Sequence, residues 1–171
     1  VQEGEIVHIF LAKQGFKPKL KLQRMEMEEV TEVMAEKSKG LVGDRYHTDN
    51  LMGTYSQTSR IPDDHRQATF TDIEKFWEAV AEMKGNFEPK QSRRNFFTKG
   101  IDWRDTEGAT VTIPVSGAEF HVWEECTPCQ IPDEGKLGFK NAFTPEWRGG
   151  VRTEITGTGL IAVAFTVLVS S

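Results

Sequence analysis

The C-terminal part of the chain is a succession of short apolar runs separated by glycines, and this pattern limits the fold more than any other feature. The runs occupy residues 110–115, 118–123, 150–155 and 160–169, and a similar run lies at residues 5–11. They are rich in β-branched and aromatic residues, as strands are. Glycines at positions 108, 117, 149, 150, 157 and 159 predict turns or bulges between them. The pattern favours a mainly β fold, a closed or nearly closed antiparallel β-barrel.

The longest apolar run, residues 160–169, is too short to be a membrane-spanning helix, which needs about 20 residues. We expect it to form one strand that is buried on both faces. Alternation of apolar and charged residues predicts a further strand at 20–27, whereas residues 29–38 fit a strand or a helix. No repeat, linker or low-complexity tract divides the chain, so we expect a single domain over residues 1–171.

One α-helix is clearly predicted, at about residues 71–84, with short extra helices elsewhere. Thr71 and Glu74 have the spacing of a capping box, and Gly85 is placed to end the helix. Apolar residues recur at helical spacing, which predicts a buried face made of Ile73, Phe76, Trp77 and Val80.

Composition restricts the partners. The chain has 171 residues, a net charge of -5 and only two cysteines. A general nucleic-acid or anionic-membrane binder needs a basic surface, so we expect neither partner, and any anion must be held locally. Two cysteines cannot form a disulfide framework, which favours a reducing compartment, the cytoplasm.

Both cysteines lie in the string Cys126-Thr-Pro-Cys129, directly after a predicted strand. Two thiols at this spacing can share a metal, cycle through a disulfide or include one reactive thiolate. No paired histidines complete a zinc site, and Pro132 and Gly135 break the chain where a thioredoxin-like helix would follow. Buried packing of both side chains is an equally good interpretation.

Three further motifs combine arginine with glycine or asparagine. They are Gly-Asp-Arg at 43–45, Arg-Arg-Asn at 93–95 and Arg-Gly-Gly at 148–150. Guanidinium groups bind phosphate or carboxylate in a bidentate manner, and glycine lets backbone N–H groups approach an anion. Each motif taken alone is more typical of solvated surface charge.

Together, and in this order, the motifs resemble the MOSC domain, the C-terminal domain of molybdenum-cofactor sulfurases, which also occurs as small stand-alone bacterial proteins. The strings are GLVGDRY (40–46), RRNFFTKGI (93–101), ECTPC (125–129) and RGGVRTEI (148–155). The resemblance runs from about residue 5 to the C-terminus and implies a β-barrel.

The resemblance also implies a molybdenum-pterin cofactor, which can be lost on purification; the family is further associated with pyridoxal-phosphate binding. Cys129 is the thiol that would ligate molybdenum or carry sulfur as a persulfide. Positions that match the motifs assign cofactor binding to Arg45, Arg93, Arg94 and Arg148, supported by Asn95 and Gly149.

Two functions of different classes follow. The first is reduction of N-hydroxylated compounds or sulfur transfer. Its partners would be a small-molecule substrate, or a sulfur donor or acceptor protein, together with a redox partner. The sequence leaves the oligomeric state open. The second is a non-catalytic barrel that binds an anion or a partner, in which the cysteines are structural. A reversible disulfide between Cys126 and Cys129 ranks third.

Overall fold

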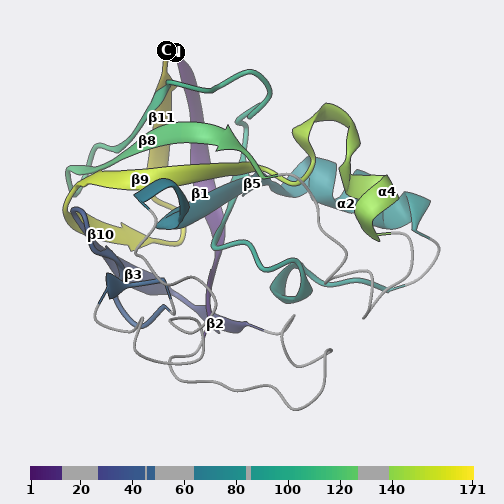
Figure 1. Ribbon diagram of the computed structural model, residues 1–171, viewed down its shortest axis with the longest axis horizontal. Helices are drawn as coiled ribbons and strands as arrows, with labels where there is room; N and C mark the ends of the chain where they lie inside the picture. Colours follow the sequence, from purple (N-terminus) through teal and green to yellow (C-terminus); the bar gives the residue numbers. More distant parts are fainter. Residues whose placement is uncertain (13–26, 45, 49–63, 84–85, 127–138) are drawn as a thin grey trace.

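Pairing between the first and last strands closes the main sheet on itself. The computed structural model describes residues 1–12, 27–44, 46–48, 64–83, 86–126 and 139–171. Within them, seven strands form a closed barrel in the order β11-β7-β8-β9-β5-β6-β1 (Figure 1). The strands are β1 (Gln2–Leu11), β5 (Ala68–Asp72), β6 (Phe96–Lys99), β7 (Thr110–Ile113), β8 (Ala118–Glu125), β9 (Val151–Gly157) and β11 (Thr166–Ser170). Antiparallel pairing places Gln2 of β1 opposite Val169 of β11. The expected mainly β, closed barrel is confirmed.

The barrel is mixed, because one of its pairings is parallel. β5 and β6 run in the same direction, with Phe70 opposite Phe96, whereas the other barrel pairings among the described residues are antiparallel. Parallel neighbours need a crossover connection. The chain supplies it with helix α2 (Ile73–Glu82), which lies between the two strands in sequence.

The apolar run at 160–169 forms two strands, so the expectation of one strand buried on both faces is wrong. β10 (Gly159–Ala162) ends at a turn in which Ala164 has a φ of 75°, and β11 then begins at Thr166. Burial alternates in both strands: Ile161, Val167 and Val169 are buried, and their neighbours are less so. The turn moves the chain from one sheet to another, which the apolar composition did not indicate.

A small second sheet accounts for the undecided segment at 29–38. β10 pairs with β3 (Glu32–Glu36), which pairs with β4 (Gly40–Leu41). β2 (Glu28–Val30) adds to β1. Within the segment, residues 29–30 and 32–36 are therefore strand. Most of the strand predicted at 20–27 lies outside the described residues.

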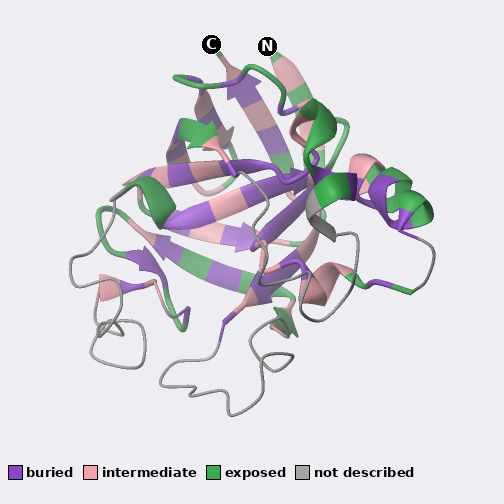
Figure 2. Ribbon diagram, turned by 45° about the vertical axis from the view of Figure 1, so that its right-hand side comes forward, coloured by how far each residue is buried: buried purple, intermediate pink, exposed green. Residues whose placement is uncertain are grey.

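Aromatic side chains fill the barrel. Phe70 stacks on Phe96 with ring centroids 4.9 Å apart and meets Phe120 edge-on at 5.0 Å. Trp103 is 1% exposed and donates from Nε1 to the Thr98 hydroxyl at 2.9 Å, which satisfies its polar atom inside the core. Figure 2 shows the alternation of buried and less buried residues along the strands.

Helix α2 packs beside α4 (Phe139–Phe143) on one side of the barrel (Figure 1). Phe76 is fully buried in a second apolar cluster, with Phe87, Phe97 and Phe143. Trp77 is 48% exposed, so its expected place on the buried face is wrong. The remaining described helices are short: η3 (Asp64–Arg66), η4 (Pro89–Gln91) and η5 (Pro145–Trp147).

The N-cap of the helix lies one residue later than expected. Asp72, not Thr71, is the N-cap: it has extended φ and ψ, and its side chain accepts from the Glu74 N–H at 2.8 Å. Thr71 belongs to β5, and its hydroxyl instead donates to the Gly149 carbonyl at 3.3 Å. The helix ends at Glu82 with Met83 as C-cap, and Gly85 lies outside the described residues.

In the part of the chain that the structure describes, no helix is long and apolar enough to cross a membrane.

Replacing the N-cap should destabilise the protein. Asp72→Ala removes the acceptor for the Glu74 N–H, and we expect the free energy of unfolding to fall by about 1 kcal/mol. Asp72→Ser keeps an acceptor and should retain most of the stability. Urea unfolding of the three proteins measures this; equal midpoints for wild type and the Ala variant would contradict Asp72 as the cap.

Candidate functional site

Hydrogen bonds join the four sequence motifs to one another. The first link starts at Asp44, which is 1% exposed. Its Oδ1 accepts from the Ala12 N–H at 2.9 Å and from the Asn95 amide at 3.4 Å. Its Oδ2 accepts from the Tyr46 N–H at 3.2 Å, the short-range turn contact that aspartate favours. Asp44 therefore ties the Gly-Asp-Arg motif to the Arg-Arg-Asn motif.

Asn95 is the second link, and its side chain is fully used inside the protein. The amide oxygen accepts from the Thr69 N–H and hydroxyl at 3.1 and 3.2 Å. The amide nitrogen donates to the Phe10 carbonyl at 3.0 Å as well as to Asp44. A buried amide with its donors and acceptors satisfied holds strands together. Asn95 thus supports the site as a connector between β1, β5 and the 93–95 loop.

Arg94 supplies the third link. Its Nε donates to the Gly149 carbonyl, and its Nη1 lies 3.4 Å from the Ser92 carbonyl. No carboxylate lies within 4.0 Å of this guanidinium among the described residues, whereas Arg148 and Arg152 both pair with glutamates. Arg94 is therefore held in place by main-chain carbonyls, and no carboxylate of the described ranges compensates its positive charge.

Gly150 is the fourth link, and its backbone lies very close to Phe70 and Thr71 of β5. A Cβ at this position would lie 2.0 Å from the Phe70 carbonyl oxygen and 2.3 Å from the Thr71 hydroxyl, and the backbone φ is +84°. Both facts require glycine. The Gly150 carbonyl accepts from the Cys126 N–H at 2.8 Å, so the glycine pair is bound directly to the cysteine motif.

Cys126, the first cysteine, is 1% exposed and unpaired. The Arg152 guanidinium lies within hydrogen-bond reach of its thiol and also donates to Glu124 at 3.0 Å. Burial alone would lower the pKa of Arg152, but the Cys126 and Glu124 side chains outweigh it and raise the pKa above its ordinary value. At neighbouring Glu125, burial raises the carboxyl pKa and repulsion from Glu107 adds to the effect.

Arg148 forms an ion pair with helix α2 that its motif did not predict. Its Nη1 and Nη2 donate to the two carboxylate oxygens of Glu82 at 2.7 and 3.1 Å, and Nη1 also donates to the Ala142 carbonyl at 2.9 Å. Glu78 lies 4.0 Å away. The Glu82 hydrogen bonds raise the pKa of Arg148 despite the opposing effect of burial. The Arg148 Nε is buried and has no hydrogen-bond partner among the described residues. Arg148 thus connects the glycine pair to helix α2.

The backbone next to these motifs is strained. Glu146 and Trp147 have φ values of 55° and 57°, and Arg93 has 65°. Residues with a Cβ avoid this left-handed region, at a cost of about 1–2 kcal/mol each, unless their surroundings hold them there. Lys75 binds Glu146 at 3.1 Å and contributes to that restraint.

The structure thus brings Arg94, Asn95, Arg148 and Gly149 together, and their role in cofactor binding stays a prediction. Arg93 belongs to the same loop as Arg94, whereas Arg45 and Cys129 lie outside the described residues. Glu82 was missed, although its sequence position carried a signal. It ends a helix whose last turn has no basic residue, and a carboxylate there needs a cation from elsewhere.

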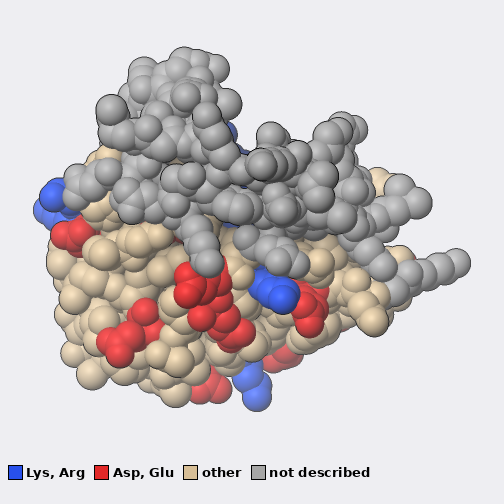
Figure 3. All heavy atoms as spheres, turned by 90° about the horizontal axis from the view of Figure 1, so that it is seen from below, with Lys and Arg blue, Asp and Glu red and all other residues tan. Residues whose placement is uncertain are grey.

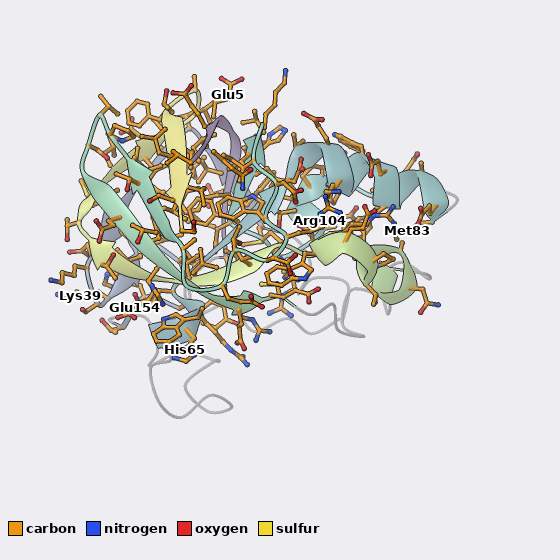
Figure 4. All side chains as sticks on the ribbon, turned by 90° about the horizontal axis from the view of Figure 1, so that it is seen from above. Glu5, Lys39, His65, Met83, Arg104 and Glu154 are labelled. Carbon is orange, nitrogen blue, oxygen red and sulfur yellow. The ribbon has the colours of Figure 1, made fainter. Side chains whose placement is uncertain are left out.

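The described surface has no broad basic patch on the face shown in Figure 3, where Lys and Arg side chains lie among Asp and Glu. A separate aromatic cluster lies on the outside of β8 and β9. His65 stacks on Trp123 with centroids 4.1 Å apart, and Trp123 donates to Glu154 at 3.1 Å; Figure 4 labels His65 and Glu154.

Substituting Gly150 should destabilise the protein far more than substituting a glycine that has a similar φ but empty space around its Cβ position. Gly150→Ala forces a Cβ into the Phe70 carbonyl, and we expect a loss of more than about 3 kcal/mol of unfolding free energy or failure to fold. Gly108 has a φ of +81° and nothing within 4 Å of the point that a Cβ would occupy, so Gly108→Ala should lose only about 1 kcal/mol. Thermal and urea unfolding measure both; equal losses would show that close approach at Gly150 is unimportant.

Similarity to known proteins is found at the level of structure. No family model and no curated protein sequence matches the chain. YuaD from Bacillus subtilis matches with a TM-score of 0.72 and 17% identity, over 98% of this chain and 95% of that one. YiiM from Geobacillus stearothermophilus gives 0.66 and 15%, over 98% and 75%, and YiiM from Escherichia coli gives 0.62 and 13%, over 96% and 69%. The chain has the fold of these small stand-alone MOSC-domain proteins.

Proposed function

We propose that the chain binds a molybdenum-pterin cofactor, with Arg94 holding the anionic tail and Cys129 as the thiolate ligand of the metal or a persulfide sulfur carrier. The observation that carries the proposal is the state of Arg94. Its guanidinium is oriented by the carbonyls of Gly149 and Ser92 and has no carboxylate partner among the described residues. A fixed guanidinium with uncompensated charge is suited to bind phosphate.

The residues present fit such a group in two respects. The Gly149 carbonyl accepts from the Arg94 Nε and so holds a guanidinium, a group that binds phosphate, beside the glycine pair. A cysteine thiolate is a soft donor and suits molybdenum. The chain's own contribution is to hold the anion with Arg94 and to keep the cysteine motif attached to the glycine pair through the Cys126 N–H and the Gly150 carbonyl. When bound, the cofactor would supply the redox centre that reduces N-hydroxylated substrates.

Sulfur transfer uses the same site differently. Cys129 would then carry sulfur between a donor and an acceptor protein, and the arginines would stabilise the thiolate form that accepts it. The alternative of a non-catalytic anion- or partner-binding barrel is favoured by one observation. Cys126, one of the two cysteines of the motif, is 1% exposed and packs as a buried residue.

Molybdenum analysis tests the role of Cys129. The protein is purified anaerobically from a molybdenum-sufficient host, and metal and pterin are measured in the wild type, Cys129→Ala and Cys126→Ala. We expect near-stoichiometric molybdenum in the wild type, a loss of most of it in Cys129→Ala and a milder loss in Cys126→Ala. Equal molybdenum in the wild type and Cys129→Ala would refute thiolate ligation. A reactive Cys129 without molybdenum would favour sulfur transfer.

Phosphate titration tests Arg94. Calorimetric titration with inorganic phosphate at low ionic strength should show an affinity that falls about tenfold or more in Arg94→Gln, because a charge-assisted hydrogen bond is removed. Arg104→Gln is the matched control: Arg104 is exposed and pairs with Asp102 at 2.8 Å, so its loss should leave phosphate binding nearly unchanged. Similar affinities in the wild type and Arg94→Gln would remove the basis of the anion site.

A further inference from the structure

The C-terminal end of α2 forms a negative environment around Arg148. Glu78 and Glu82 are one helical turn apart and both face this guanidinium, at 4.0 and 2.7 Å. The last carbonyls of a helix carry partial negative charge, and the last turn of α2 has no basic residue to balance them. The Ala142 carbonyl is a further acceptor. Arg148 is therefore the cation that neutralises this end of the helix.

This environment makes Arg148 a poor anion ligand. Its side chain is 10% exposed, and the two carboxylates nearest to it would repel a phosphate. Arg94 lacks such neighbours among the described residues. The two arginines thus have different tasks: Arg94 is available to a ligand, and Arg148 is committed to the helix.

The ion pair between Arg148 and Glu82 helps to hold the turn that precedes the glycine pair. Glu146 and Trp147 adopt left-handed backbone conformations that need external restraint. Two ion pairs from α2 provide it on either side: Lys75 with Glu146 at 3.1 Å, and Glu82 with Arg148.

This turn also places the acceptor that orients Arg94. The Gly149 carbonyl accepts from the Arg94 Nε and from the Thr71 hydroxyl, and it follows Arg148 directly in the chain. A displacement of Arg148 would move this carbonyl away from the Arg94 guanidinium. Glu82, Arg148 and Gly149 thereby link helix α2 to the Arg94 guanidinium.

We propose that Glu82 is a positioning residue of the anion site: by holding Arg148, it keeps the Gly149 carbonyl where it orients Arg94 toward a bound phosphate group. This inference rests on the proposed function. It assigns a role to a helix residue outside the four motifs, and it replaces the expected ligand role of Arg148 with a supporting one.

The test compares Glu82→Gln with Glu78→Gln in the same phosphate titration, at a temperature well below unfolding. Glu82 makes the bidentate pair and Glu78 lies at the limit of contact, so the two variants remove equal charge at positions one turn apart. We expect the dissociation constant for phosphate to rise at least fivefold in Glu82→Gln and less than twofold in Glu78→Gln. Lys75→Gln, which breaks the second restraint, should weaken binding in the same direction.

A merely structural role gives a different result. Glu82→Gln would then lower the unfolding temperature but bind phosphate as the wild type does, and that outcome overturns the inference. Tighter binding in Glu82→Gln also overturns it, because Arg148 would then be the ligand that Glu82 masks. If Glu82→Gln does not fold, Lys75→Gln decides: unchanged affinity in that variant counts against the inference. Absence of phosphate binding by the wild type, or wild-type affinity in Arg94→Gln, refutes the anion site itself and the inference with it.

Discussion

Pairing of β1 with β11 is the interaction on which the rest of the structure depends. It brings the two ends of the chain together, as Figure 1 shows, and converts a row of strands into a closed barrel. Closure removes the free sheet edges that would otherwise attract other strands. Elsewhere in the same barrel, β5 pairs with both β6 and β9. The loops that carry the motifs can then reach one another.

The candidate site follows from contacts between those loops. Asp44, Asn95, Arg94 and the glycine pair are joined by hydrogen bonds and by adjacency in the chain, in a series that ends at Cys126. The polar groups of most of these residues form hydrogen bonds with one another, which makes the site rigid. Arg94 differs because its charge is unpaired among the described residues. A rigid frame around one available guanidinium is the arrangement expected of a preorganised anion site.

The sequence predicted local features well where the local pattern and the tertiary environment agree. Strands at the N-terminus and at 110–123 follow their apolar alternation, and Phe76 is buried as its helical spacing indicated. The prediction failed where one residue had two competing partners. Thr71 could cap the helix, but β5 extends through it and its hydroxyl contacts Gly149. Trp77 has helical spacing, yet it lies at the margin of the packed face and is exposed.

The same distinction applies to function. The sequence by itself determined the barrel class, the order of the four motifs and the positions of the glycines that separate the strands, because residue types and their spacing encode turns and strand faces. Only the tertiary structure decided that the 160–169 run splits into two strands, and that Arg94 is available whereas Arg148 is paired with Glu82. Partners far apart in sequence compete for each arginine, and their competition is resolved by the fold, since charge compensation depends on distance in space.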